Sequence, residues 1–543
     1  MPALVLFAFG LALRLLFQAA AHDGGAGWHA GFQGDAPVWQ ELAHKLANGT
    51  VDDSLRLPLR PPAMQWLVAW LWNGDPATVG LVRSVFAAIG ASIAPLVWLL
   101  LRTHVAPRTA ALTAVLCAAS SNLLLLSSGL HVEGLYLALV LASLLLQPHL
   151  AGRRAHGWAF AFGLLHGLLC LLRAEHVLTA LPLLWLARRS GATWRVLALA
   201  GAIATAVVAP WQLRANAMID DYNAGAPALP PAVVPWDDDA VAAVRALPSF
   251  QQVPVFAFVG DTVRARGGTR VRAADLAIVR EAYDCWPEPL PRRFVALYGG
   301  LNFYLGNTPE AASGFSAAAL DRAPPLTGGD ARYPPGLRQV LPRNGTIALG
   351  YPPHLDLVVN GTQRGLAEIT ADPSAAAVRV ATKLWHAAEG ATGGLGGHAL
   401  PIGLTGTRRQ VDFVTATGWW ANGWRLALLV VAAIGWWRLR SVRALQPLLV
   451  FAATKLLVVA AFYGYARHGA MCLPVVALGV AAAADALLGE RLARTWPRWL
   501  GIVAAALLAL EAVRAATTTV LVDGGPAGSW PAHDFRERTV TFR

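Results

Sequence analysis

Apolar residues gather in runs of about twenty along most of the chain, and polar residues fill the gaps between them. A run of about this length can cross a lipid bilayer as a single helix. The fold class predicted is a polytopic α-helical membrane protein of about 11 spans. The predicted spans are 3–21, 79–101, 107–126, 133–149, 156–173, 174–188, 194–211, 418–437, 444–464, 469–488 and 497–516.

The polar stretch after the first run predicts a short amphipathic helix at the membrane surface, within residues 34–49. Asp35 is placed to cap its start and Gly49 to end it. Capping alone explains Asp35, but a carboxylate has two oxygens and capping uses one, so a chemical role stays open. The apolar stretch 64–72 is too short to span and is predicted to lie in the interface.

Basic residues are unevenly distributed among the short loops. If the N-terminus is cytoplasmic, the inner loops hold 13 of them and the outer loops two, Arg173 and Arg467. Cytoplasmic loops carry the excess of Lys and Arg. The N-terminus is therefore predicted inside, and 22–78, 212–417 and the C-terminal tail outside.

The long polar block divides the chain into four parts. We predict an N-terminal membrane module at 1–211, an outer domain at 212–417, a C-terminal membrane module at 418–516 and an outer tail at 517–543. Within the block, short apolar runs at 254–259 and 355–359 predict strands, and 375–389 predicts an amphipathic helix. A mixed α/β outer domain follows from this pattern.

Composition excludes several classes. Charged residues are 14% of the chain, against about 25% in soluble domains, and hydrophobic residues are 56%. A net charge of +12 first suggests nucleic acid. However, residues 211–417 hold 18 basic and 18 acidic side chains, so the excess lies among the spans, where sidedness explains it. No nucleic-acid partner is expected.

Ionisable residues near the outer membrane face are candidate functional groups, because such groups are costly at membrane depth. Glu133 begins a predicted span, where an acid also complements the helix dipole. His131 and Glu133, together with Asp35, could bind a divalent ion, but their spacing is not a recognised metal motif. We therefore expect no required metal or other cofactor, and a divalent metal is not favoured.

Arg173 and Arg467 break the sidedness rule. An ion pair with Glu175 explains Arg173 without any ligand. The alternative is that the two guanidinium groups hold a phosphate at the outer leaflet. For Arg14 in the first span and Arg83 in the second, snorkelling to the lipid headgroups is the simplest explanation.

Seven short segments also follow one another in a characteristic order: 12–15, Asp35 with Trp39 and Ala43, 60–62, 133–136, 210–216, 302–307 and 467–474. In this order they resemble the GT-C membrane glycosyltransferases that use polyprenyl-phosphate sugars. The resemblance is to the bacterial branch of protein O-mannosyltransferases, aminoarabinose transferases and the RgtA/B/C/D-like group. The chain departs from that pattern in its single first-loop acid, in Ala215 after Arg214, and in 225–300.

The resemblance implies an inverting sugar transfer at the outer face of a bacterial inner membrane, from a polyprenyl-phosphate sugar to an acceptor hydroxyl. It implies Asp35 as the general base, with Glu133 beside it in the catalytic centre. Arg467 and Arg173, with Arg60 behind them, would bind the phosphate of the sugar donor. His131, His468 and Asn307 would contact the sugar or the acceptor, which is an unknown glycan, lipid or protein.

A secondary transporter or lipid flippase is the alternative function. Transporters often show inverted repeats and place their ionisable groups at the midplane. Here the spans divide seven and four around the outer domain, no repeat is visible, and the ionisable groups cluster toward one face. These features favour an enzyme.

Overall fold

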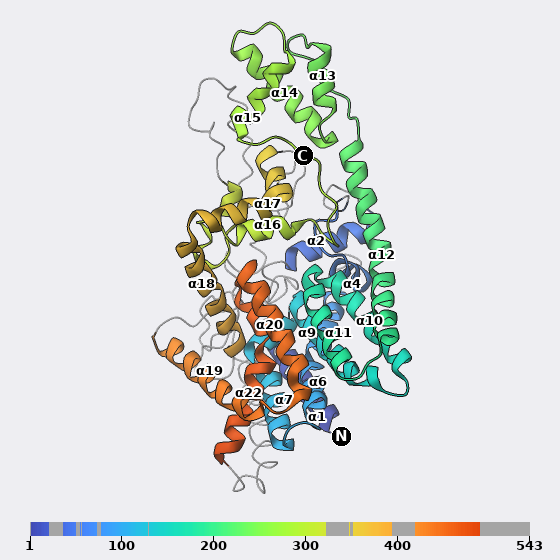
Figure 1. Cartoon of the computed structure of the whole chain (residues 1–543), viewed down its shortest axis with the longest axis vertical. Helices are drawn as coiled ribbons and strands as arrows, with labels where there is room; N and C mark the ends of the chain where they lie inside the picture. The colour runs from blue at the N-terminus through green and yellow to red at the C-terminus, as the bar shows by residue number, and fades with distance from the viewer. Residues whose placement is uncertain are drawn as a thin grey trace.

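The computed structural model is helical and elongated (Figure 1). It describes residues 2–20, 36–49, 55, 57–72, 78–128, 130–321, 347, 351–393 and 419–488. The N-terminus lies at the lower end of the long axis in Figure 1, and α13 (Asp238–Arg245), α14 (Ser249–Ala265) and α15 (Ala277–Tyr283) lie at the upper end. The sequence predicts that these two segments lie on opposite sides of a membrane, which requires such a separation.

The N-terminal module is a helix bundle whose elements fall on the predicted apolar runs. Two runs are broken near their middle, at Ser92 and Ser120. One apolar core joins α6, α9 and α10 and continues into the C-terminal module through Phe451 and Leu473. The elements are α1 (Pro2–Ala20), α5 (Val79–Ala91), α6 (Ile93–Leu101), α7 (Pro107–Ala119), α8 (Ser121–Ser128), α9 (Val132–Leu146), η2 (Gln147–Ala151), α10 (Ala155–Leu172), η3 (Ala174–His176), α11 (Val177–Arg189) and α12 (Trp194–Ala224).

The C-terminal module packs against this bundle. Its described elements are α19 (Trp419–Leu439), α20 (Gln446–Ala461), α21 (Ala466–Ala470) and α22 (Leu473–Leu488). Helices α19 and α22 meet backbone to backbone, since a Cβ added at Gly435 would lie 1.8 Å from the Gly479 carbonyl oxygen. The predicted span 497–516 lies outside the described residues.

Among the described residues, eight helices match predicted spans in length or apolar character. Five are long and apolar enough to cross a membrane: Gly80–Leu101, Val132–Ala151, Ala155–Leu172, Trp194–Ala224 and Arg443–Ala461. Three shorter apolar helices are Pro2–Leu16, Pro107–Ala119 and Leu473–Leu487. The chain is thus an integral membrane protein, while the total of eleven spans stays a prediction.

The strands predicted for the outer domain are wrong. Residues 254–259 lie within α14, and 355–359 lie within α17 (Pro352–Ala371). An apolar run of six residues cannot be told from a helix segment by periodicity alone. In the described parts of 212–417 there is no strand, only an isolated bridge between Trp236 and Val271. The helix predicted at 375–389 is confirmed as part of α18 (Pro373–Thr392).

The first predicted outer loop contains two short helices, where the sequence predicts an amphipathic helix within 34–49 and an interfacial stretch at 64–72. They are α2 (Ala36–Ala47) and α4 (Ala63–Leu71), and Gly49 ends α2 with a φ of +66°. This left-handed conformation is common where a glycine ends a helix. Asp35 itself lies outside the described residues.

Snorkelling is wrong for Arg14 and Arg83, because both side chains are buried inside the bundle. Arg14 Nε donates to Ser127 Oγ at 2.7 Å and thereby ties α1 to α8. Arg83 Nη2 donates to the Gln18 carbonyl oxygen at 3.3 Å, and Gln18 Nε2 donates to the Arg83 carbonyl oxygen at 3.0 Å. Both arginines therefore join helices of the bundle.

Candidate active site

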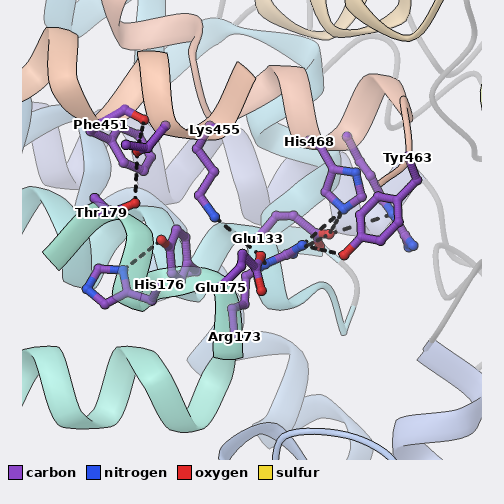
Figure 2. Close-up of polar contacts among 12 residues, drawn as sticks. Glu133, Arg173, Glu175, His176, Thr179, Phe451, Lys455, Tyr463 and His468 are labelled. Carbon is purple, nitrogen blue, oxygen red and sulfur yellow. Dashed lines mark hydrogen bonds and ion pairs between the residues drawn. The ribbon is translucent and has the colours of Figure 1, made fainter. Parts of the chain in front are cut away.

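Arg173 is the centre of a buried polar cluster between the two membrane modules (Figure 2). Helix α10 ends at Leu172, and the extended backbone of Arg173 carries its side chain out of the helical path. We call the group around it the Arg173 cluster. It comprises Arg173, Glu133, Glu175, Lys455, Tyr463, Arg467 and His468.

The Arg173 guanidinium contacts four side chains. Its Nη1 lies 3.1 Å from Glu133 Oε1, and its Nε lies 2.5 Å from Glu175 Oε1. Its Nη2 lies 3.3 Å from the Tyr463 hydroxyl and 3.2 Å from His468 Nε2. The simple ion pair with Glu175 is therefore present, but it is one part of a larger network.

Glu133 lies in the first turn of α9 and joins both halves of the chain. Besides Arg173, its Oε1 lies 3.2 Å from His468 Nε2 and 3.6 Å from Arg467 Nε. The cap position before it is held by His131, whose side chain does not cap the helix. The two arginines that break the sidedness rule thus share one carboxylate.

Lys455 brings a third cation to the cluster from the middle of α20. Its Nζ lies 3.4 Å from Glu175 Oε1 and 4.1 Å from the centre of the Tyr136 ring. The Tyr136 ring also lies 5.9 Å from Arg173 Cζ, so its face stabilises both cations. The Tyr136 hydroxyl in turn is 2.8 Å from His176 Nδ1, which fixes the ring.

Charge and burial together favour an anionic ligand. Three cations, Arg173, Lys455 and Arg467, face two carboxylates, Glu133 and Glu175, which leaves an excess of one positive charge when each carries its ordinary charge. A positive excess away from water is offset best by a bound anion.

His468 is neutral in this setting, because burial lowers its pKa to about 4. Its Nε2 faces Glu133, while its Nδ1 is buried without a hydrogen-bond partner among the described residues.

The structure brings together four of the residues predicted from the sequence: Glu133, Arg173, Arg467 and His468. Arg60 instead lies between the rings of Trp39 and Tyr298, with Cζ 5.3 Å and 5.6 Å from the ring centres. Asn307 bonds to the end of α20, as described below. His131 is buried beside Glu133.

The first outer loop packs against the site. Trp39, Leu42 and Ala43 of α2 share an apolar cluster with Val132 and Leu172, the residues that directly precede Glu133 and Arg173. In the sequence, Asp35 directly precedes α2. In the described residues, no three His, Cys, Asp or Glu side chains gather as metal ligands, and the suggested divalent site includes Asp35, outside them.

Sequence reasoning missed Lys455, Tyr136 and Tyr463. Lys455 carried a usable signal, since it is a charged residue inside an apolar span and one of only three lysines in the chain. Tyr136 and Tyr463 carried none, because aromatic residues are ordinary in spans and at membrane interfaces.

No family model and no curated protein matches the sequence. Several solved structures resemble it. An oligosaccharyltransferase from Archaeoglobus fulgidus, in complex with zinc and sulfate, is 12% identical with a TM-score of 0.39, over 96% of this chain and 53% of that one. The archaeal oligosaccharyltransferase AglB from the same organism, with an inhibitory peptide and a dolichol-phosphate, is 13% identical with a TM-score of 0.40, over 96% and 56%.

A third structure is ArnT from Cupriavidus metallidurans bound to undecaprenyl phosphate, at 15% identity and a TM-score of 0.32, over 91% of this chain and 80% of that one. This chain spans about half the length of the two archaeal structures.

Proposed function

We propose that the protein transfers a sugar, with inversion, from a polyprenyl-monophosphate donor to an acceptor hydroxyl at the outer face of the membrane. The Arg173 cluster is the observation that carries this proposal. It places two arginines and a lysine around two carboxylates in a buried site. The planar guanidinium group matches phosphate oxygens, and a membrane-embedded cluster is where the phosphate of a lipid-linked sugar can be reached.

The proposed step forms one bond and breaks one. The acceptor oxygen bonds to the anomeric carbon while the bond from that carbon to the phosphate oxygen breaks. The electron pair of the broken bond leaves on the phosphate, whose growing charge Arg173, Arg467 and Lys455 stabilise. Donors fixed in a site sheltered from water do this without reorganising.

The acceptor proton passes to a carboxylate. We assign this role to Asp35 from its sequence motif, since Glu133 and Glu175 are already engaged by the cations. Glu133 then orients Arg173 and Arg467. Arg60, stacked between Trp39 and Tyr298, is proposed as an outer contact for the phosphate, and His131 and His468 as neighbours of the sugar.

The test uses the purified protein in nanodiscs with a radiolabelled polyprenyl-phosphate sugar and a hydroxyl acceptor. We expect label in the acceptor, and an anomeric configuration opposite to that of the sugar donor by NMR. A product of retained configuration would contradict the proposed displacement. Movement of the lipid across the bilayer of proteoliposomes, without bond formation, would instead identify the alternative function, a transporter or flippase.

A further inference from the structure

The end of helix α20 is held by two side chains that come from far away in the sequence. The last carbonyl groups of a helix have no partner within that helix. At the end of α20, Lys383 Nζ donates to the Ala460 carbonyl oxygen at 3.2 Å, and Asn307 Nδ2 donates to the Ala461 carbonyl oxygen at 2.8 Å. A lysine also complements the negative end of the helix dipole.

The two side chains form one joint because they also bind each other. Lys383 Nζ donates to Asn307 Oδ1 at 3.1 Å, and Asn307 Nδ2 makes a second bond, to the Phe303 carbonyl oxygen at 2.7 Å. These contacts use the amide oxygen and both amide protons of Asn307. Both side chains are buried. The joint ties α16 (Tyr298–Leu305) and α18 to the end of α20.

The backbone around the joint is packed too closely for larger residues. A Cβ added at Gly464 would lie 2.3 Å from the Lys383 Cα, and one added at Gly390 would lie 1.7 Å from the Ala466 carbonyl oxygen. On the other side, Asn122 Nδ2 donates to the Gly390 carbonyl oxygen at 2.9 Å, which anchors α18 to α8. Helix α18 is therefore closely packed between the N-terminal bundle and the connection from α20 to α21.

That connection and helix α21 form the segment that supplies the site. It begins directly after Ala461, and it carries Tyr463 in the connection and Arg467 and His468 in α21, which reach Arg173 and Glu133. Lys383 and Asn307 fix the backbone where the segment leaves α20, only a few residues before these three side chains.

We propose that Lys383 and Asn307 are positioning residues for the sugar transfer: they hold the 462–470 segment so that Arg467 and His468 meet Glu133. The link to sugar transfer rests on the proposed function, whereas the claim that Lys383 and Asn307 position the 462–470 segment does not. A residue that acts only through Arg467 loses its effect once Arg467 is gone, so the two effects are not additive.

Two measurements test this on the full-length protein in nanodiscs. The first is hydrogen exchange of the 462–470 amides in Lys383→Met and Asn307→Leu. The second is binding of polyprenyl monophosphate by Lys383→Met, alone and in an Arg467→Ala background. Thr382→Ala is the matched control, because the Thr382 hydroxyl bonds only within α18, to the Val378 carbonyl oxygen at 3.0 Å.

We expect faster exchange confined to 462–470 in both joint variants and none in Thr382→Ala. Lys383→Met should weaken phosphate binding by about 10-fold to 100-fold, the scale of a misplaced contact, but have little further effect on Arg467→Ala. Lys383→Arg should recover part of the affinity, because it keeps a cationic donor. A general loss of thermal stability would not produce this pattern.

The outcomes separate the two proposals. Unchanged exchange at 462–470 overturns the positioning role, and so does an equal loss of binding with and without Arg467. If exchange rises as expected but the wild-type protein binds no polyprenyl monophosphate, the joint stands and the proposed function fails. If the wild-type protein binds polyprenyl monophosphate and Lys383→Met matches it in both measurements, the proposed function stands and the positioning role fails.

Discussion

Arg173 and Glu133 join the end of α10 to the start of α9, with 3.1 Å between Nη1 and Oε1. The same carboxylate oxygen lies 3.6 Å from Arg467 Nε, so one acid orients both arginines of the short loops that are predicted to be outer. Removing one partner of a buried ion pair costs about 3–5 kcal/mol of unfolding free energy. Variants of neighbouring residues therefore separate binding from folding better than changes at Arg173.

Arg467→Ala should reduce turnover while the protein still inserts and folds. Arg467 is partly exposed, and its Nε lies 3.6 Å from a carboxylate oxygen of Glu133. Loss of a charged transition-state contact should cost about 2.7–4 kcal/mol in activation free energy. Arg467→Lys should retain only part of the wild-type turnover, since lysine lacks the planar guanidinium fork. Single-turnover rates of sugar transfer measure these losses.

The matched control for Arg467 is Arg292→Ala, which removes an exposed arginine paired with Asp220 at 2.6 Å. Exposed ion pairs contribute about 0–1 kcal/mol, so the control should behave as wild type. If Arg467→Ala shows wild-type kinetics with the sugar donor, Arg467 has a structural role and does not bind the phosphate.

Lys455→Met should weaken binding of polyprenyl monophosphate. The substitution keeps the length and apolar stem of the side chain but removes the charge, so the Arg173 cluster falls from an excess of one positive charge to none. A hydrogen bond to a charged group contributes about 1.5–3 kcal/mol, which corresponds to a loss of roughly 10-fold to 100-fold in affinity. Isothermal titration in nanodiscs reports it, and unaltered affinity would remove Lys455 from the phosphate site.

Acid should destabilise the protein through His468. Its pKa falls from an ordinary value of about 6.5 to about 4 in the folded chain. Between these values the unfolded chain takes up a proton that the folded site refuses, so unfolding free energy falls as pH falls from about 6.5 toward 4. His468→Gln lacks this group and should show a shallower loss of thermal stability over that window. Identical pH slopes would contradict the assignment of a neutral buried imidazole.

The helices of the membrane modules could be predicted from the sequence because apolar run length is set by the bilayer. The helices of the predicted outer domain could not be predicted in this way. Val255, Phe256 and Val259 are apolar neighbours in a run of six, which fits a buried strand as well as the helix that the structure shows. The two competing structures differ in tertiary packing, which local pattern does not report.

The candidate site could be predicted from the sequence only in part, for a similar reason. Arg173 and Arg467 stood out because they violate a rule of sidedness, and Glu133 because acids are costly at membrane depth. Lys383 and Lys455 are not among the residues predicted for the site, yet both are buried and hydrogen-bonded. Their partners lie 76 and 280 residues away, a pairing that no local pattern contains.

Topology is the premise on which every proposed site residue depends. Reporter fusions after Arg154, near Gly300 and at Arg543 read sidedness directly. We expect an inside signal at the first position and an outside signal at the other two, from the 13-to-2 basic asymmetry of the short loops. An inside signal near Gly300 would place the Arg173 cluster on the wrong face for the proposed reaction.

The role of Asp35 decides between a helix cap and a general base. Asn caps a helix about as well as Asp, so a cap alone makes Asp35→Asn nearly harmless. As a base, the same substitution keeps the shape and the cap but cannot accept the proton. Glu41→Gln is the matched control, because Glu41 lies on α2 and pairs with Lys45 of the same helix.

Single-turnover transfer from a defined polyprenyl-phosphate sugar in nanodiscs therefore tests the central claim most directly. We predict that Asp35→Asn slows transfer by about 10²–10⁴-fold, with binding of the sugar donor and expression retained, while Glu41→Gln transfers at the wild-type rate. Transfer by Asp35→Asn at a near wild-type rate would contradict the claim and make Asp35 a helix cap.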